Sequence, residues 1–253
     1  MEATLDKLKI IGGREGFNEI MLEKDYLITR LLYLIKDVEG IYFKGGTALH
    51  KIFFNHQRLS EDLDFAATRS VRKIVDDIKS ALKRSIFEEI GFGKDVDGFT
   101  RVIIKYKLFH EEGKIFIDLN ERGRILLEPK KYKIIHFYEE FIPKFKVKCL
   151  DKREIISEKF MAAATRYRPR DYVDLYFLVK NKIPFNKVII KKKFLLNKLK
   201  FSSDMIFENT NKVFIRWDND LSQILKEPLD FKKVMEVLKK HFKYRLKKVK
   251  KQN

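Results

Sequence analysis

The spacing of apolar residues predicts two long helices in the first third of the chain. Residues 17–37 carry apolar side chains three and four apart, and Gly40 follows the end of this pattern. Residues 70–90 show the same period, with Ser70 as the predicted N-cap and Gly91 as the predicted stop. We therefore expect helices on both sides of the short apolar runs that lie between them.

Those short runs predict strands. The run IYF at 41–43 leads into Gly45 and Gly46, and helical periodicity resumes in TALHKIFF, which begins at Thr47. The run LDFAA at 63–67 predicts a second strand. The order strand, Gly-Gly turn, helix, strand is therefore expected within about thirty residues.

The middle of the chain predicts a β-hairpin. The segments FTRVIIKYKLFH (99–110) and KIFIDLN (114–120) are rich in β-branched and aromatic residues and flank the tripeptide EEG. The first half of the chain is therefore expected to mix α and β structure.

The pattern after Pro143 is helical. A helix is expected over 152–167, and Pro169 can occupy the first turn of the next one. Residues 184–253 are again helical in pattern, and no repeat or low-complexity linker interrupts the chain. We place a domain boundary near residue 150, with a mixed-sheet domain at 1–150 and a helical bundle at 151–253.

Charge is unevenly distributed. The 55 Lys and Arg exceed the 36 Asp and Glu by 19. The segments 180–200 and 231–253 contribute +8 and +9, whereas 1–179 contributes +5 and 201–230 contributes −3. Clustered lysines suit a polyanion such as RNA or DNA. An equally good explanation is the solvated face of amphipathic helices, because apolar residues recur at helical spacing between these lysines.

Composition excludes several classes of protein. With 45% hydrophobic and 13% aromatic residues the chain is no disordered basic tail. The single cysteine, Cys149, allows no intramolecular disulfide, and no Cys/His set has zinc-ligand spacing. No signal segment or membrane span is recognisable. A cytoplasmic protein with no membrane partner is expected.

Two aspartates carry the first chemical signal. Asp62 and Asp64 are two apart, so on a strand both carboxylates project from one face while Leu63 and Phe65 point to the other. Two carboxylates on one side repel each other unless a cation lies between them. Oxygen ligands of this kind suit Mg²⁺, which keeps water and substrate phosphates in its other positions.

The glycine turn upstream carries the second signal. Gly45 and Gly46 allow a ligand close to the backbone, and the following helix offers N–H groups to a phosphate. Thr47 adds a hydroxyl. Either motif alone is common, but their order and spacing are more specific.

A third carboxylate would complete a two-metal site. Asp118 lies in the otherwise apolar strand KIFIDLN, where a charge needs a reason. The alternative is an aspartate near a strand end that faces solvent. We favour the metal role, because neighbouring strands can bring Asp62, Asp64 and Asp118 together.

These motifs resemble a known family. The order GGTAL, RLSEDLDF, an isolated strand aspartate and EKFMAAATRYRPRDYVDLYFL resembles the AbiEii/AbiGii-type nucleotidyltransferases, the toxins of type IV toxin–antitoxin systems in the DNA polymerase β-like superfamily. The resemblance covers about residues 17–180, and the remainder is similar only in being helical and basic. It implies an α+β fold, with a mixed-sheet nucleotidyltransferase domain followed by a C-terminal helical bundle.

The resemblance also implies roles for individual residues. It assigns Gly45, Gly46 and Thr47 to a nucleotide-phosphate loop, although the family's usual glycine-serine is glycine-glycine-threonine here. It assigns Asp62 and Asp64 to Mg²⁺, and Asp118 to the third, less uniformly placed carboxylate. Lys159 matches a lysine that faces nucleotide phosphate, and Asp174 matches the acid of the RDxxDL segment.

Other polar residues have two readings. Lys159 and Arg166 are seven apart, on one helix face, and could neutralise a triphosphate. Arg166 and Arg170 could equally form ion pairs with aspartates at the helix junction. Arg58 and Ser60 either shape the turn before the strand of Asp62 and Asp64 or contact nucleotide. His50 and His56 are interpreted as bystanders.

The function predicted from sequence is Mg²⁺-dependent transfer of a nucleoside monophosphate from an NTP, with two metal ions at Asp62, Asp64 and Asp118. The resemblance implies an RNA 3′ end, notably that of tRNA, or a protein side chain as the acceptor, and the positive charge of the C-terminal third favours RNA. The resemblance also implies a separately encoded antitoxin as a possible partner. Two alternatives remain open: a nucleic-acid-binding protein with a degenerate site, and a phosphotransferase or protein-nucleotidylating enzyme.

Overall fold

A seven-stranded mixed sheet forms the centre of the N-terminal part. The computed structural model describes residues 3–87, 89–109 and 112–243. Its strands are β1 (Ile41–Lys44), β2 (Asp62–Ala67), β3 (Glu89–Val96), β4 (Phe99–Lys107), β5 (Glu112–Asn120), β6 (Lys130–Lys133) and β7 (Lys146–Cys149). Their order is β3-β4-β5-β2-β1-β7-β6. The pairs β2/β5 and β1/β7 are parallel and the others are antiparallel.

Helices precede, interrupt and follow the sheet. They are α1 (Leu5–Glu15), α2 (Glu19–Leu34), α3 (Gly45–Ala48), the π-type turn η1 (Leu49–Phe53), α4 (Val71–Leu82), α5 (Lys152–Arg166), α6 (Pro169–Lys180), α7 (Lys187–Leu196), the 3₁₀ turn η2 (Ser203–Phe207), α8 (Thr210–Ile215), α9 (Trp217–Leu221) and α10 (Phe231–His241). The sheet and the helical C-terminal region confirm the expected α+β fold.

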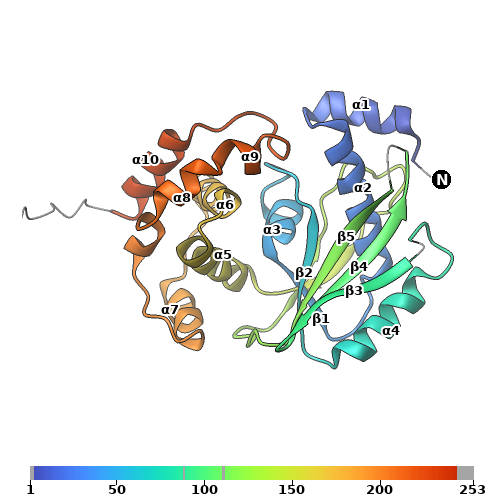
Figure 1. Ribbon diagram of the computed structural model, residues 1–253, viewed down its shortest axis with the longest axis horizontal. Helices are drawn as coiled ribbons and strands as arrows, with labels where there is room; N and C mark the ends of the chain where they lie inside the picture. Colours follow the sequence, from blue (N-terminus) through green and yellow to red (C-terminus); the bar gives the residue numbers. More distant parts are fainter. Residues whose placement is uncertain (1–2, 88, 110–111, 244–253) are drawn as a thin grey trace, which may run out of the picture.

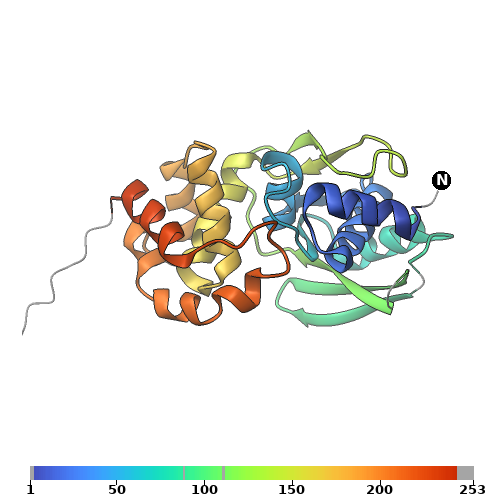
Figure 2. The same cartoon turned by 90° about the horizontal axis from the view of Figure 1, so that it is seen from above.

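The two groups of elements lie side by side. Figure 1 shows the sheet with α1, α2 and α4 on one side, and α5 to α10 on the other. Figure 2, turned by 90°, shows the same separation, with α3 next to the helical group. Buried apolar residues nevertheless form one continuous cluster, from Leu8 in α1 to Leu238 in α10. A domain boundary near residue 150 therefore stays a prediction.

Local sequence explains where several helices begin. Asn18 accepts hydrogen bonds from two backbone N–H groups of the first turn of α2, and Asp151 accepts one at the start of α5. Pro169 occupies the first turn of α6, where its missing N–H is not needed. Asp230 caps α10 in the same way as Asp151 caps α5. The predicted helices over 152–167 and after Pro169 are confirmed.

Two sequence-based helix boundaries are wrong. The helix expected over 70–90 ends at Leu82, and Gly91 lies inside β3, which pairs with β4 along the sheet edge. Arg84 has a φ of 62°, so the chain turns there before the strand begins. Tertiary pairing has replaced the last turns of the expected helix. The helix after the glycine turn begins at Gly45, two residues earlier than expected.

The region after Pro143 is not helical at once. Residues 146–149 form β7, which pairs with β1 and β6 and alternates exposed lysine with buried Val147 and Cys149. Its period of two is short and was hidden by the helical pattern that follows. Cys149 is fully buried. None of the helices in the described ranges combines the length and apolar content that a membrane crossing needs.

Candidate active site

Charged side chains follow one another across four strands. Lys44 on β1 is directly opposite Asp64 on β2, Asp64 is opposite Asp118 on β5, and Asp118 is opposite Arg101 on β4. Residues opposite each other in a sheet project from the same face. The four side chains therefore form a row with two carboxylates in the middle and one cation at each end, which we call the cross-strand row.

Asp62 lies beside this row. The burial pattern of β2 alternates, with Leu63 and Phe65 buried and Asp62 and Asp64 partly accessible. Both aspartates are thus on one face, as the sequence predicted. Burial, followed by the charges of Asp64 and Asp118, raises the pKa of Asp62 to about 6. Burial also raises the pKa of Asp64, against the opposing charge of Lys44. A bound cation would relieve this repulsion.

Asp118 is buried, and both of its side-chain oxygens are bound by another residue. The residue is 9% exposed. Arg101 donates from Nε to Oδ1 and from Nη2 to Oδ2, both at 2.7 Å. The alternative of an aspartate that faces solvent is therefore excluded. The arrangement of Asp118 as a third metal ligand stays a prediction, because a guanidinium holds both oxygens in this structure.

The glycine turn is shaped to lie against Asp64. Gly45 has a φ of 78°, and a Cβ placed on it would come within 2.1 Å of Asp64 Oδ2. A Cβ on Gly46 would come within 2.6 Å of Arg58 Nη2. Only glycine fits at these two positions. The turn therefore brings the backbone at the start of α3 next to the carboxylate strand.

Thr47 and Ser60 connect the turn to β2. The Thr47 hydroxyl is buried, donates to the backbone carbonyl of Asp62 at 2.6 Å, and lies 2.8 Å from the Ser60 hydroxyl. Both side chains therefore hold the glycine turn against the strand. Their predicted contacts with nucleotide stay predictions.

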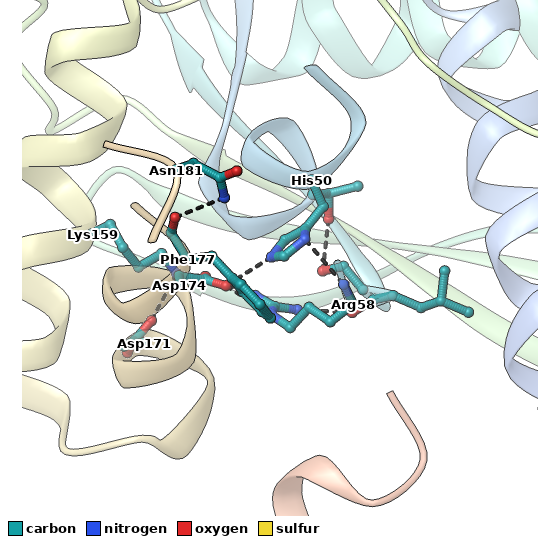
Figure 3. Close-up of polar contacts among 10 residues, drawn as sticks. His50, Arg58, Lys159, Asp171, Asp174, Phe177 and Asn181 are labelled. Atoms are coloured by element: carbon teal, nitrogen blue, oxygen red, sulfur yellow. Dashed lines mark hydrogen bonds and ion pairs between the residues drawn. The ribbon is translucent and has the colours of Figure 1, made fainter. Parts of the chain in front are cut away.

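Asp174 is the centre of a buried polar network (Figure 3). Arg58 donates to both of its oxygens at 2.8 Å, and His50 Nε2 lies 2.8 Å from Oδ1. Lys159 Nζ lies 2.9 Å from Oδ2. Burial would raise the pKa of Asp174, but Arg58, Lys159 and His50 hold it well below its usual range. The carboxylate is fully buried, so it acts on the site only through the residues that it binds.

Lys159 belongs to this network and also lies near enough to Asp64 for its charge to act on that carboxylate. Its Nζ is 2.7 Å from Asp171 Oδ1 as well as 2.9 Å from Asp174, and its side chain is 10% exposed. Burial lowers the pKa of Lys159, but the two aspartates outweigh that effect and raise it. The lysine therefore stays charged beside the carboxylate strand. Arg170, at the start of α6, pairs with Glu61 at 3.5 Å.

A cleft of about 770 Å³ lies between the glycine turn, the end of β5 and helices α5 and α7. Asp64, Gly45 and Gly46 form part of its wall, and Met161 and Leu195 are among its apolar residues. The cations that line it come from both parts of the chain: Lys44, Arg122, Arg124, Lys159, Arg166, Lys193 and Lys198. This excess of cations over the acids Asp64 and Glu158 suits a polyphosphate.

A second buried ion network supports the wall of the cleft. Glu158 binds Lys44 at 3.0 Å and Lys193 at 2.9 Å, and Lys193 also binds Glu154 at 2.6 Å. Burial raises the pKa of Glu158, but the two lysines outweigh it and lower the pKa to about 2. The network ties β1 and α7 to α5, the helix that carries Lys159.

The donor set fits a divalent cation at Asp62 and Asp64. Their carboxylates share one face, repel each other and are oxygen ligands. Within the described residues, no three acidic, histidine or cysteine side chains converge on one metal position. Both oxygens of the third carboxylate, Asp118, are bound by Arg101.

Sequence reasoning missed several residues of the site. Arg101 belongs to the alternating pattern of β4, but its partner follows only from the hairpin register. Lys44 and Glu158 were missed, although a lysine directly before two glycines was a usable signal. His50 was interpreted as a bystander, yet it contacts Asp174. His56 Nε2 lies within hydrogen-bond distance, 2.8 Å, of the backbone carbonyl oxygen of Ile135.

Solved structures share this fold. MenT4, the nucleotidyltransferase toxin Rv2826c from Mycobacterium tuberculosis H37Rv, matches with a TM-score of 0.70 and 16% identity, over 95% of this chain and 89% of that one. JHP933 from Helicobacter pylori matches with a TM-score of 0.58 and 21% identity, over 90% and 92%. No functionally curated protein matches the chain significantly. Both identities are below 25%, so these matches show the fold that the chain shares with them.

A comparison with models of protein families identifies the family of this chain. The sequence model of the family described as "Nucleotidyl transferase AbiEii toxin, Type IV TA system" matches residues 27–251. The chain therefore belongs to the AbiEii family of nucleotidyltransferase toxins, and membership implies an NTP substrate and an antitoxin. The match also corrects the range expected from motifs alone, because it includes the basic C-terminal helices as well as residues up to 180.

Proposed function

We propose that the protein transfers a nucleoside monophosphate from an NTP to a hydroxyl of RNA, with a tRNA 3′ end as the first candidate, in a Mg²⁺-dependent reaction. The observation that carries the proposal is the position of Asp64, which lies directly beside the Gly45 turn in the wall of a cation-lined cleft, with Asp62 on the same face of β2. This chemistry needs carboxylates that hold a divalent cation and a cationic cleft that receives the phosphates.

The reaction exchanges one phosphorus–oxygen bond for another. The acceptor oxygen bonds to the α-phosphorus, the bond from that phosphorus to the bridging oxygen breaks, and pyrophosphate leaves. The hydroxyl proton passes to water or to a carboxylate. Asp62 and Asp64 would hold Mg²⁺, which supplies Lewis-acid stabilisation of the phosphate oxygens when bound.

The protein's own residues do the positioning. The glycine turn lets phosphate oxygens approach the backbone, and Lys159 and Arg166 bring positive charge to the same cleft. Asp174 is assigned a positioning role, since it holds Arg58 against Gly46 and holds Lys159 beside the cleft. Removing it is expected to weaken nucleotide binding without removing a group that touches substrate.

Charge supports an RNA acceptor. Residues 180–200 carry eight lysines and no acid, and Lys193 and Lys198 from this segment line the cleft. Exposed Lys191 and Lys192 continue the positive surface on α7. The basic stretch at 244–253 lies outside the described residues. An extended polyanion that enters the cleft would contact the exposed lysines Lys191, Lys192 and Lys198, whereas Lys193 is buried and paired with Glu154 and Glu158.

The direct test uses labelled nucleotides. The protein is incubated with each α-labelled NTP, Mg²⁺ and total RNA, and the labelled species is identified. Label from the α-phosphate on RNA is expected, and the Asp62→Asn, Asp64→Asn double variant should abolish it. Transfer of a γ-label would identify a phosphotransferase. Label on protein alone would replace the RNA acceptor with a protein side chain.

A further inference from the structure

Arg101 binds the carboxylate that was expected from sequence to complete a two-metal site, that of Asp118. It ends the cross-strand row in which Asp118 and Asp64 are flanked by Arg101 and Lys44. The row contains two negative and two positive side chains. The sheet therefore supplies part of the charge compensation that carboxylates in a metal site usually obtain from metal ions.

The contact between Arg101 and Asp118 is built into the sheet. Two parallel hydrogen bonds of 2.7 Å use both carboxylate oxygens, the geometry in which a guanidinium binds a carboxylate best. The guanidinium carbon also lies 4.6 Å from the centre of the Phe116 ring, which is two residues before Asp118 on the same face of β5. The hairpin register and the aromatic ring together hold Arg101 in this position.

Asp62 and Asp64, unlike Asp118, have side-chain oxygens that are not bound by an arginine or lysine of the described residues. Among the described residues, no direct ion pair or hydrogen bond engages their side-chain oxygens; Lys44, the neighbour of Asp64 in the row, pairs with Glu158 instead. Arg170, which is close enough to Asp62 to act on it electrostatically, pairs with Glu61. Two carboxylates are thus available to a cation, while the third is already neutralised.

We propose that the active site holds a single divalent cation, bound by Asp62 and Asp64, and that Arg101 on Asp118 supplies the positive charge in place of a second one. The proposal rests on the proposed function and replaces the two-metal arrangement expected from sequence. It makes Arg101 a determinant of metal number, and it removes Asp118 from the set of metal ligands.

The test counts bound metal ions. Mn²⁺ is titrated into the full-length protein with a saturating non-hydrolysable NTP analogue, and free Mn²⁺ is measured by electron paramagnetic resonance. Wild type is expected to bind one ion per chain, and Asp118→Asn is also expected to bind one. Two ions in wild type with one in Asp118→Asn would overturn the proposal and leave the proposed function intact. No bound ion in wild type would overturn both.

Arg101→Gln provides the complementary measurement. Removal of the guanidinium frees both Asp118 oxygens, so the number of bound ions should rise from one to two. A folded Arg101→Gln protein that still binds one ion would contradict the proposal. The matched control is Lys114→Gln, which removes one exposed positive charge from β5, four residues from Asp118, and should leave the count at one. If Arg101→Gln does not fold, the comparison of wild type with Asp118→Asn decides the question alone.

Discussion

Arg58 binds the carboxylate of Asp174 through two parallel hydrogen bonds of 2.8 Å, although the residues are 116 positions apart in the sequence. Both side chains are essentially inaccessible to solvent. Arg58 precedes the carboxylate strand and its guanidinium lies against Gly46, whereas Asp174 belongs to α6. This pair is therefore a rigid connection between the glycine turn and the C-terminal helices.

Removing one partner of this pair should destabilise the protein strongly. Asp174→Ala leaves the Arg58 guanidinium buried and unpaired, so the free energy of unfolding should fall by about 3–5 kcal/mol. Urea unfolding measures the change. Asp37→Ala is the control, because Asp37 forms an exposed pair with Lys36 and should change stability little. Equal effects of the two substitutions would show that the buried network does not stabilise the fold.

The glycine turn gives a second prediction. Gly45→Ala places a Cβ within 2.1 Å of Asp64 Oδ2 at a φ of 78°, so the turn or the carboxylate must move. Affinity for a nonhydrolysable NTP should fall at least tenfold, as measured by calorimetry.

Gly13→Ala is the matched control for this substitution. Gly13 lies in α1, and a Cβ there meets nothing within 4 Å. Alanine is the better helix former, so stability should rise by about 0.5–1 kcal/mol with nucleotide affinity unchanged. Unchanged nucleotide binding in Gly45→Ala would remove the glycine turn from the proposed site.

The sequence predicted the paired aspartates and the glycine turn well, because both depend on local rules. The period of two in a strand places Asp62 and Asp64 on one face without any knowledge of the rest of the fold. A strand followed by two glycines and a helix is similarly local. For these residues the structure adds distances to an arrangement that was already expected.

The residues that neutralise those aspartates could not be found in this way. Arg101 faces Asp118 only because β4 and β5 pair in one particular register, and Lys44 faces Asp64 because β1 and β2 do. Arg58 and His50 reach Asp174 from the other part of the chain. A single sequence without pairing information contains the residue types but not these distances.

Two buried histidines predict how stability depends on pH. Burial, followed by the charge of Arg58, lowers the pKa of His50 to about 4, and burial followed by the charge of Lys51 lowers that of His56 to about 4. In the unfolded chain both histidines take up a proton below about pH 6.5. In the folded protein the same two side chains stay uncharged until the pH falls to about 4. Each histidine therefore destabilises the folded state as the pH falls through this window, by up to about 1.4 kcal/mol per pH unit.

His50→Asn tests the sign of this effect. At pH 7.5 both side chains are neutral, so the difference from wild type reports lost packing and hydrogen bonding. Between pH 6.5 and 4.5 the stability of wild type should fall more steeply than that of the variant, in urea unfolding at matched ionic strength. Parallel curves would mean that His50 takes up a proton equally in the folded and unfolded states.

The lysines of α7 predict the salt dependence of RNA binding. Lys191 and Lys192 are exposed on the helix that lines the cleft, so phosphates of a bound RNA would release counterions there. Replacing both with Gln should weaken binding and reduce the slope of log K against log salt by about 1.4 for single-stranded RNA. Arg72 and Lys73 on α4 are also exposed, and their double Gln variant removes the same charge from the other part of the molecule. Equal loss in both pairs would indicate that net charge alone attracts RNA. A loss confined to the α7 pair would locate the RNA path beside the carboxylates, where an acceptor hydroxyl must lie for transfer to occur.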